Sequence, residues 1–350
     1  MTKQTSLATL ALGLALTAAV GRAQTWTYLP PNRTFTSGTD TNWYWFTNQS
    51  PAVATLRLTS GTCSFTGALK FDTAGIAYIQ NSTGSGTTTP QLTIQADPAG
   101  GFGSGGSTWY FFVSNGVSSY TVIQGTPVNT RVTFRAIGRG LLGLNVASNT
   151  WKSLYVGGSA AGESNATLRC GVADALCPTS FVAVCLNSVL DLNGYDQTIG
   201  NLVFDNKGTG TIFSASPAVL TVNQRAASGC DFPYEYRGTI GGAISLVKSG
   251  PSNLTMTAAN TYTGSTSVAQ GRLITKDPQC LATGTVVRLY TGAKLKLDFA
   301  GTNTVTSLYV NDTPRLMGVY GAANLPDYLE GAGYLRTLWP PPPGTVIAIH

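Results

Sequence analysis

The chain has 350 residues, of which 43% are hydrophobic and 10% are charged, and its formal net charge is +6. A chain this rich in apolar residues can bury a core, which excludes a disordered protein. Its lysines and arginines form no run, which argues against nucleic acid as a partner.

Residues 1–23 have the pattern of a secretory signal peptide. Lys3 gives a positive start, an apolar run extends from residue 7 to residue 20, and Gly21-Arg22-Ala23 places small residues at the cleavage site. The run is short for a membrane span, and no later segment approaches bilayer length. We therefore expect the mature chain to have no transmembrane span. We expect it to be secreted, displayed at the cell surface or held in the periplasm.

Residues 24–159 are rich in aromatic side chains. Two blocks, at residues 42–46 and 109–112, are dense in rings. We expect this region to form either the first coils and N-terminal cap of a solenoid or a separate β-sandwich. Aromatic rings present flat apolar faces to sugars, although they are equally common in β cores. The candidate carbohydrate contacts are Trp43, Trp45, Trp109 and Tyr110.

Two glycine patterns and one histidine are the remaining signs of cofactor or metal chemistry. Gly-x-Gly-x-x-Gly begins at Gly101 and again at Gly138, but neither is followed by helix-forming sequence, so flexible turns explain both. The only histidine is His350, and no Cys-x-x-Cys pair exists. We expect no cofactor and no metal.

The chain has six cysteines, an even number that favours disulfides in an exported protein. Three of them are close enough in sequence for one bond to staple a local loop, although fifteen connectivities are possible. The six are Cys63, Cys170, Cys177, Cys185, Cys230 and Cys280.

Apolar residues alternate with period two along the chain, and no run with helical period persists. Short strands such as Leu190-x-Leu192 and Leu308-x-Val310 are separated by glycine, asparagine, aspartate and serine. This rhythm permits a sandwich, a barrel or a solenoid. It is clearest in residues 160–338, where small turn residues and inward aliphatic residues fit the coils of a parallel β-helix.

Residues 246–273 contain Val-Lys-Ser-Gly, Leu-Thr-Met, Ala-Asn-Thr-Tyr-Thr-Gly and Gly-Arg-Leu. This stretch resembles the autotransporter-associated β-strand repeat, and weaker similarity extends over residues 189–335. The resemblance implies an all-β protein with a right-handed parallel β-helix, of the kind found in exported bacterial passenger proteins. It implies no catalytic residues. Residues 339–350 form a proline-rich tail outside the predicted helix.

The fifteen acidic residues include no pair separated by a single residue, so no strand offers two carboxylates on one face. Acids from neighbouring coils could still converge, as glycoside hydrolysis requires. Asp191, Asp196 and Asp205 are the best such set, and turn formation is the competing interpretation.

We therefore expect a non-enzymatic exported β-helix that acts in surface structure, adhesion or extracellular matrix. Its partner would be a cell-surface or matrix polysaccharide or another surface protein. The alternatives are a carbohydrate-binding or polysaccharide-degrading β-helix and a subunit that self-associates into extracellular fibres.

Overall fold

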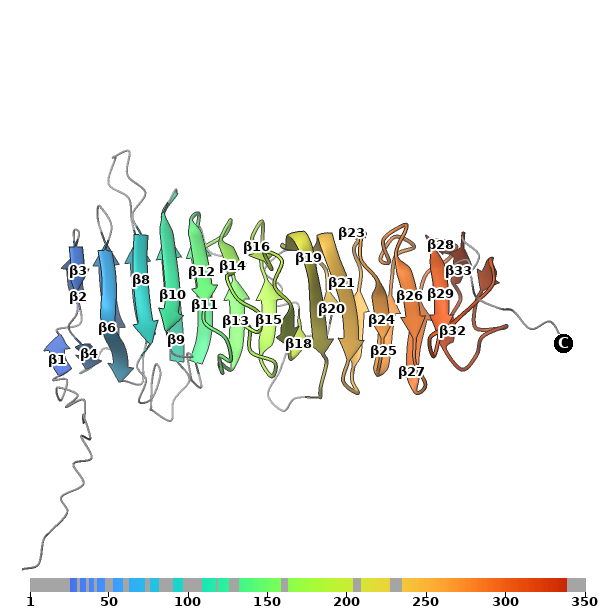
Figure 1. Ribbon diagram of the computed structural model, residues 1–350, viewed down its shortest axis with the longest axis horizontal. Coiled ribbons are helices and arrows are strands. Elements are labelled where there is room, and N and C mark those ends of the chain that lie inside the picture. The colour runs from blue at the N-terminus through green and yellow to red at the C-terminus, as the bar shows by residue number, and fades with distance from the viewer. Residues whose placement is uncertain are drawn as a thin grey trace, which may run out of the picture.

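The computed structural model is an elongated rod of stacked strands (Figure 1). It describes the strands given below and, with gaps at 118, 126–131, 159–162, 204–208 and 227–234, the main chain of residues 109–338. Side chains are described for residues 79–81, 112–117, 119–124, 133–158, 163–203, 209–226 and 235–338. No helix occurs among these residues.

The first sheet runs the length of the rod and contains 17 strands. Neighbouring strands within this sheet pair in parallel, except for the antiparallel pair β29 and β30 at the C-terminal end. The strands are β1 (Trp26–Leu29), β3 (Gly38–Asp40), β4 (Trp43–Thr47), β6 (Cys63–Asp72), β8 (Gln91–Ala96), β10 (Tyr120–Gly125), β12 (Leu141–Asn145), β14 (Thr167–Cys170), β16 (Val189–Asp191), β17 (Gln197–Ile199), β19 (Thr211–Asn223), β21 (Thr239–Ser249), β23 (Thr261–Tyr262), β24 (Thr266–Val268), β26 (Val286–Leu289), β29 (Ser307–Val310) and β30 (Thr313–Pro314).

Three further sheets form the other faces. The second has eight strands, β2 (Asn32–Phe35), β5 (Val53–Leu58), β7 (Ile76–Asn81), β9 (Trp109–Asn115), β11 (Val132–Gly138), β13 (Ser153–Val156), β15 (Phe181–Val184) and β18 (Asn201–Leu202). The third has five, β20 (Glu235–Tyr236), β22 (Asn253–Met256), β25 (Gly271–Thr275), β27 (Ala293–Leu297) and β32 (Leu329–Gly331). The fourth has three, β28 (Thr302–Val305), β33 (Tyr334–Thr337) and β31 (Gly318–Tyr320).

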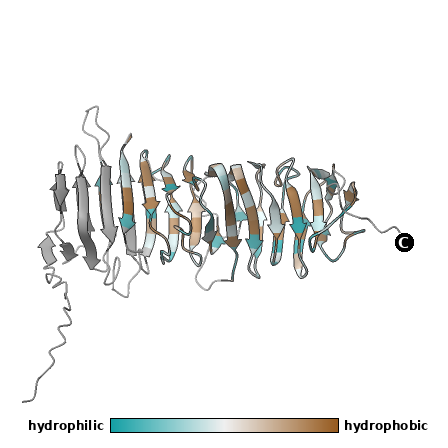
Figure 2. Ribbon diagram, in the orientation of Figure 1, coloured by the Kyte–Doolittle hydropathy of each residue, from teal (hydrophilic) through white to brown (hydrophobic). Residues whose placement is uncertain are grey.

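Inward residues of successive coils stack in register and form the core. On the third sheet, Leu254 lies opposite Leu273, which lies opposite Leu295 and then Leu329. All four are buried, and they belong to one apolar cluster that continues along the rod. Apolar and polar residues alternate along the strands (Figure 2). Period-two alternation therefore places one face of each strand in a dry interior.

Turns between strands use residues that tolerate left-handed backbone. Asn193 and Gly194 have φ angles of 53° and 81°, a conformation that glycine and asparagine adopt at low cost. Gly250 has a φ of 76°, and a Cβ there would collide with the carbonyl oxygen of Gln224 in the preceding coil. Glycine is required where coils approach this closely.

The predicted all-β class and parallel β-helix are confirmed. The ladders also cross the predicted boundary at residue 159, because β12 pairs with β14 and β13 pairs with β15. The two predicted regions thus contribute strands to the same sheets. The predicted signal peptide, residues 1–23, and the proline-rich tail, residues 339–350, lie outside the described residues.

Candidate functional site

The most unusual side chain of the repeat-like segment is Lys248, which is fully buried. Its position in β21 lies opposite Val222 of the preceding coil and Val268 of the next. The aliphatic stem of Lys248 thus takes a place in an inward column whose other members are aliphatic residues. A charged group is rarely buried unless it is paired or fully hydrogen-bonded.

Three carbonyl oxygens at one corner of the solenoid surround the Lys248 ammonium group. Nζ donates to Ser249 at 2.8 Å, to Gly250 at 2.8 Å and to Gln270 at 2.9 Å. These bonds use the three donors of an ammonium group and join the corners of two successive coils. Burial lowers the pKa of Lys248 to about 8 from its ordinary 10.5. Lys248 therefore stabilises the turn through hydrogen bonds made from the interior of the rod.

Asn260 makes a second connection between coils. Its Oδ1 accepts a bond of 2.7 Å from the Ile240 amide, and its Nδ2 donates to the Cys280 carbonyl at 2.6 Å. These partners precede and follow it by one coil. The buried Tyr262 hydroxyl lies 2.6 Å from the Thr266 hydroxyl. The polar residues of the repeat-like segment therefore satisfy buried backbone and side-chain groups.

A cavity of about 340 Å³ opens at a corner of the N-terminal half. Ser114 and Arg139 contribute polar side chains to its wall, and Val117 contributes an exposed apolar one. Its lining residues, which come from β7, β9, β11 and the turns after them, are Gln80, Asn81, Ser114, Asn115, Gly116, Val117, Gly138 and Arg139. A site of this size with hydroxyl, amide and guanidinium groups could hold a small polar ligand.

A ladder of amides supports the inner wall of this cavity. Asn81 lies opposite Asn115, and both are buried. Asn81 Nδ2 donates to the Tyr120 carbonyl at 3.1 Å, and Asn115 Nδ2 donates to the Leu141 carbonyl at 3.0 Å. The two amides thus hold successive turns in place.

Neither Lys248 nor the amide ladder was predicted from the sequence. The available signal was alternation, because Lys248 has the same parity as the inward Leu246, and Asn81 and Asn115 have the parity of Ile79 and Val113. A polar residue at an inward position indicates a buried group that needs partners.

The described carboxylates of the predicted acidic set accept hydrogen bonds from an arginine side chain and from backbone amides. Asp191 accepts 2.8 Å and 2.9 Å bonds from Arg169 Nε and the Asn193 amide. Asp196 Oδ1 accepts a 2.7 Å bond from the Val219 amide. Asp205 lies outside the described residues. The turn-forming interpretation therefore fits Asp191, whereas the Asp196 carboxylate bonds to β19 of the next coil.

The prediction of disulfides is wrong for the four cysteines whose side chains are described. Cys170, Cys177, Cys185 and Cys280 are buried free thiols. Cys170 and Cys177 belong to the inner core, whereas Cys185 packs with Tyr155, Ala183 and Val203 in a separate cluster. Alternation thus places Cys185 in different apolar surroundings from Cys170 and Cys177, and a local disulfide cannot join the two clusters. The side chain of Cys63 and all of Cys230 lie outside the described part.

Burial also protects two of these thiols. Desolvation raises the pKa of Cys280 to about 11, and the thiol donates to the Met256 carbonyl at 3.1 Å. Desolvation, followed by the charge of Asp191, raises the pKa of Cys170. Because the thiolate is the reactive form, both cysteines are held in an unreactive state.

The predicted carbohydrate contacts lie on two strands. Trp43 and Trp45 are in β4, and Trp109 and Tyr110 begin β9, the strand whose other end reaches the cavity. The side chains of these four residues lie outside the described part of the chain. A described aromatic pair, Phe134 and Trp151, stacks in the core with ring centroids 5.2 Å apart.

The described residues offer neither a cluster of metal ligands nor a membrane-spanning helix. They contain no group of three or more histidine, cysteine, aspartate and glutamate side chains that could hold a metal ion. No helix in this part of the chain is long and apolar enough to cross a membrane.

Comparison with known families confirms the resemblance noted in the sequence. Residues 246–274 match the model of the family described as passenger-associated-transport-repeat. The match covers β22, β23, β24 and β25, together with the end of β21 that carries Lys248. No curated protein matches the chain, and no solved structure does. A passenger repeat on a β-solenoid indicates an exported, passenger-like protein.

Proposed function

We propose that this exported, passenger-like protein is a non-enzymatic structural component of the cell surface or extracellular matrix. The observation that carries the proposal is the continuous stack of parallel strands along the rod (Figure 1). A rod with a hydrogen-bonded ladder along its axis resists bending, which suits a spacer or an extended adhesion surface.

The use of the polar residues supports a structural role. Lys248, Asp191 and Asp196 all form bonds within the fold. A general acid or base must keep its titrating atom within reach of a substrate. Lys248 is fully buried and Asp191 is 8% exposed, so neither offers that access, whereas Asp196 is exposed and its Oδ1 accepts the Val219 amide bond.

Fractionation of the native source into medium, cell surface, periplasm and cytoplasm tests the proposal. We expect the protein in the medium or at the surface, where protease added to intact cells removes it. A deletion strain should lose surface attachment or matrix cohesion. Recovery of the protein from the cytoplasm alone would contradict both the export and the structural role.

A second candidate function is binding of a neutral polysaccharide at the corner cavity. The cavity wall combines the Ser114 hydroxyl with the Arg139 guanidinium group, and both can form hydrogen bonds with the hydroxyl groups of a sugar. A glycan array with wild type and Arg139→Ala should show a signal that this change reduces at least fivefold. Arg336→Ala, at the far end of the rod, is the matched control.

The same preparations distinguish binding from cleavage. We expect no release of reducing sugar from acidic or neutral polysaccharides. Release that Asp191→Asn or Asp196→Asn abolishes, in variants that retain the wild-type circular dichroism spectrum, would establish a polysaccharide-degrading enzyme instead.

A further inference from the structure

An exposed apolar surface lies at the C-terminal end of the rod. Among the described residues, nine large hydrophobic side chains are exposed, and five of them fall between residues 316 and 338. We call these five the terminal patch: Leu316 (56% exposed), Met317 (67%), Val319 (50%), Tyr334 (49%) and Leu338 (43%). Such clustering on one end of a rod marks a surface that something covers.

The terminal patch is continuous. β31 pairs with β33 in the antiparallel sense, and Val319 lies opposite Arg336. Tyr334 and Leu338 share the exposed face of the β33 segment with Arg336, because Leu335 and Thr337 between them are buried. The Thr337 hydroxyl donates to the Leu316 carbonyl at 3.1 Å, which brings Leu316 beside the end of β33.

The rod interior has its own closure and does not explain the exposure. Leu325 and Phe299 are each only 9% exposed and belong to the core cluster, and Tyr320 and Tyr328 pack against it. The Tyr320 hydroxyl donates to the Leu316 carbonyl at 2.7 Å, so the chain before β31 is anchored to the same cap. The terminal patch therefore lies outside a core that is already sealed.

We propose that the terminal patch is the docking surface for the chain's own tail, residues 339–350. The tail continues directly from Leu338, a member of the patch, and contains Trp339, Val346, Ile347 and Ile349, while His350 is its one titratable side chain. A tethered segment acts at a millimolar effective concentration, which favours it over a free partner. This inference is independent of the proposed function.

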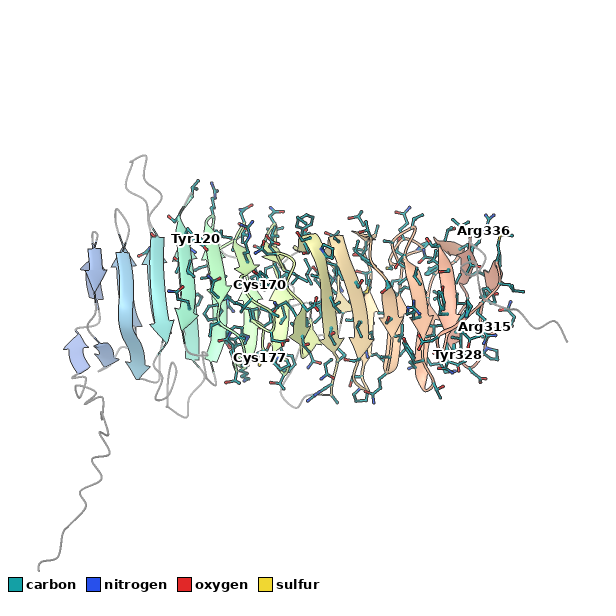
Figure 3. The ribbon with its side chains drawn as sticks, viewed as in Figure 1. Tyr120, Cys170, Cys177, Arg315, Tyr328 and Arg336 are labelled. Carbon is teal, nitrogen blue, oxygen red and sulfur yellow. The ribbon has the colours of Figure 1, made fainter. Side chains whose placement is uncertain are left out.

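Charge disfavours a second copy as the occupant. Arg315 and Arg336 lie at the same end of the rod as the patch (Figure 3). Two copies joined through this end would bring four guanidinium groups together. The tail, which contains no lysine or arginine, covers the same apolar surface without that repulsion.

Hydrogen exchange of the full chain tests the proposal. The variant Val346→Asp/Ile347→Asp should speed exchange of the β31 and β33 amides at least fivefold and raise binding of an apolar dye. Thr345→Ser, a conservative change in the same tail, should leave both unchanged. Met317→Lys combined with Ile347→Asp should exchange its β31 and β33 amides more slowly than Ile347→Asp alone, because opposite charges replace the apolar contact.

Two outcomes would overturn the proposal. In the first, wild type and the tail variant exchange alike at β31 and β33, so the tail does not cover the patch. In the second, protection depends on protein concentration and sedimentation shows a dimer, so a second copy is the occupant. Neither outcome bears on where the protein resides or whether it forms a surface structure.

Discussion

The two halves of the rod have the same architecture but differ in regularity. In the C-terminal half, the positions in register with Lys248 recur after 20, 21 and 21 residues, at Val268, Leu289 and Val310. In the N-terminal half, Asn115 follows its partner Asn81 by 34 residues and precedes Gly138 by 23. The strand ladder tolerates both spacings because strand pairing fixes the register of the strands and not the number of residues between them.

The interiors differ in the same way. The C-terminal columns are mainly aliphatic, with Tyr236 and Tyr262 among them, and their one buried charge is Lys248. The N-terminal interior contains the Phe134–Trp151 stack and the Asn81–Asn115 amides. Both halves nevertheless join coils through buried polar side chains, Asn260 in the regular half and Asn81 and Asn115 in the irregular one. The corner cavity accompanies the irregular coils.

The largest expected effect tests whether both interiors are equally tight. Leu273→Ala removes a fully buried side chain between Leu254 and Leu295, and Leu154→Ala does the same between Phe134 and Val182. Each should lower the free energy of unfolding by about 3 kcal/mol in urea denaturation. A loss below about 1 kcal/mol for Leu154→Ala alone would show that the N-terminal interior is loosely packed.

The second prediction concerns the pH dependence that Lys248 confers. Because burial lowers its folded-state pKa to about 8 from an ordinary 10.5, the unfolded chain binds more protons between these values. The stability of wild type relative to Lys248→Met should therefore rise from pH 8 to pH 10.5, by at most about 3 kcal/mol. Denaturation midpoints measured every half pH unit test this.

The comparison with Lys248→Met removes competing titrations. Burial raises the pKa of Tyr262 to about 12 and also raises that of Tyr236, so both tyrosines lower stability above pH 10 in either protein. If the difference in stability between the two proteins stays constant over this range, the three carbonyl acceptors hold the Lys248 proton in the folded protein as firmly as water holds it in the unfolded chain.

The third prediction addresses the amide ladder of the N-terminal half. Asn115→Ala removes the bond to the Leu141 carbonyl and leaves the Thr121 hydroxyl, which donates to Asn115 at 2.5 Å, without that acceptor. We expect a loss of about 2 kcal/mol. Ser114→Ala, the neighbouring position on β9, is the control and should change stability by less than about 0.5 kcal/mol.

The smallest expected effect is at the surface of the third sheet. Arg272 pairs with Glu330 through bonds of 2.9 Å and 3.1 Å, and these bonds lower the pKa of Glu330. Arg272→Met should cost less than about 1 kcal/mol at neutral pH, because water screens the pair. The difference should shrink as pH falls below the ordinary carboxyl pKa of 4.5, since protonation of Glu330 removes the attraction.

Alternation and turn composition predicted the all-β class, and the repeat-like residues 246–273 predicted the parallel stack. Both predictions succeeded because Leu254, Leu273 and Leu295 recur at the coil period, so local pattern and tertiary contact coincide. The disulfide prediction failed because an even cysteine count says nothing about which thiols face each other. Cys170 and Cys185 pack into separate clusters.

The sequence by itself determined which residues point inward, because a strand turns its side chains by half a revolution at each step. It did not determine which coil each inward residue meets, since loop length is free to vary between strands. Only the tertiary structure placed three carbonyls around Lys248, aligned Asn81 with Asn115 and gathered the terminal patch at one end. Each of these arrangements includes a contact between separate strands or coils, such as that of Lys248 with Gln270, which stacking creates and the local pattern does not specify.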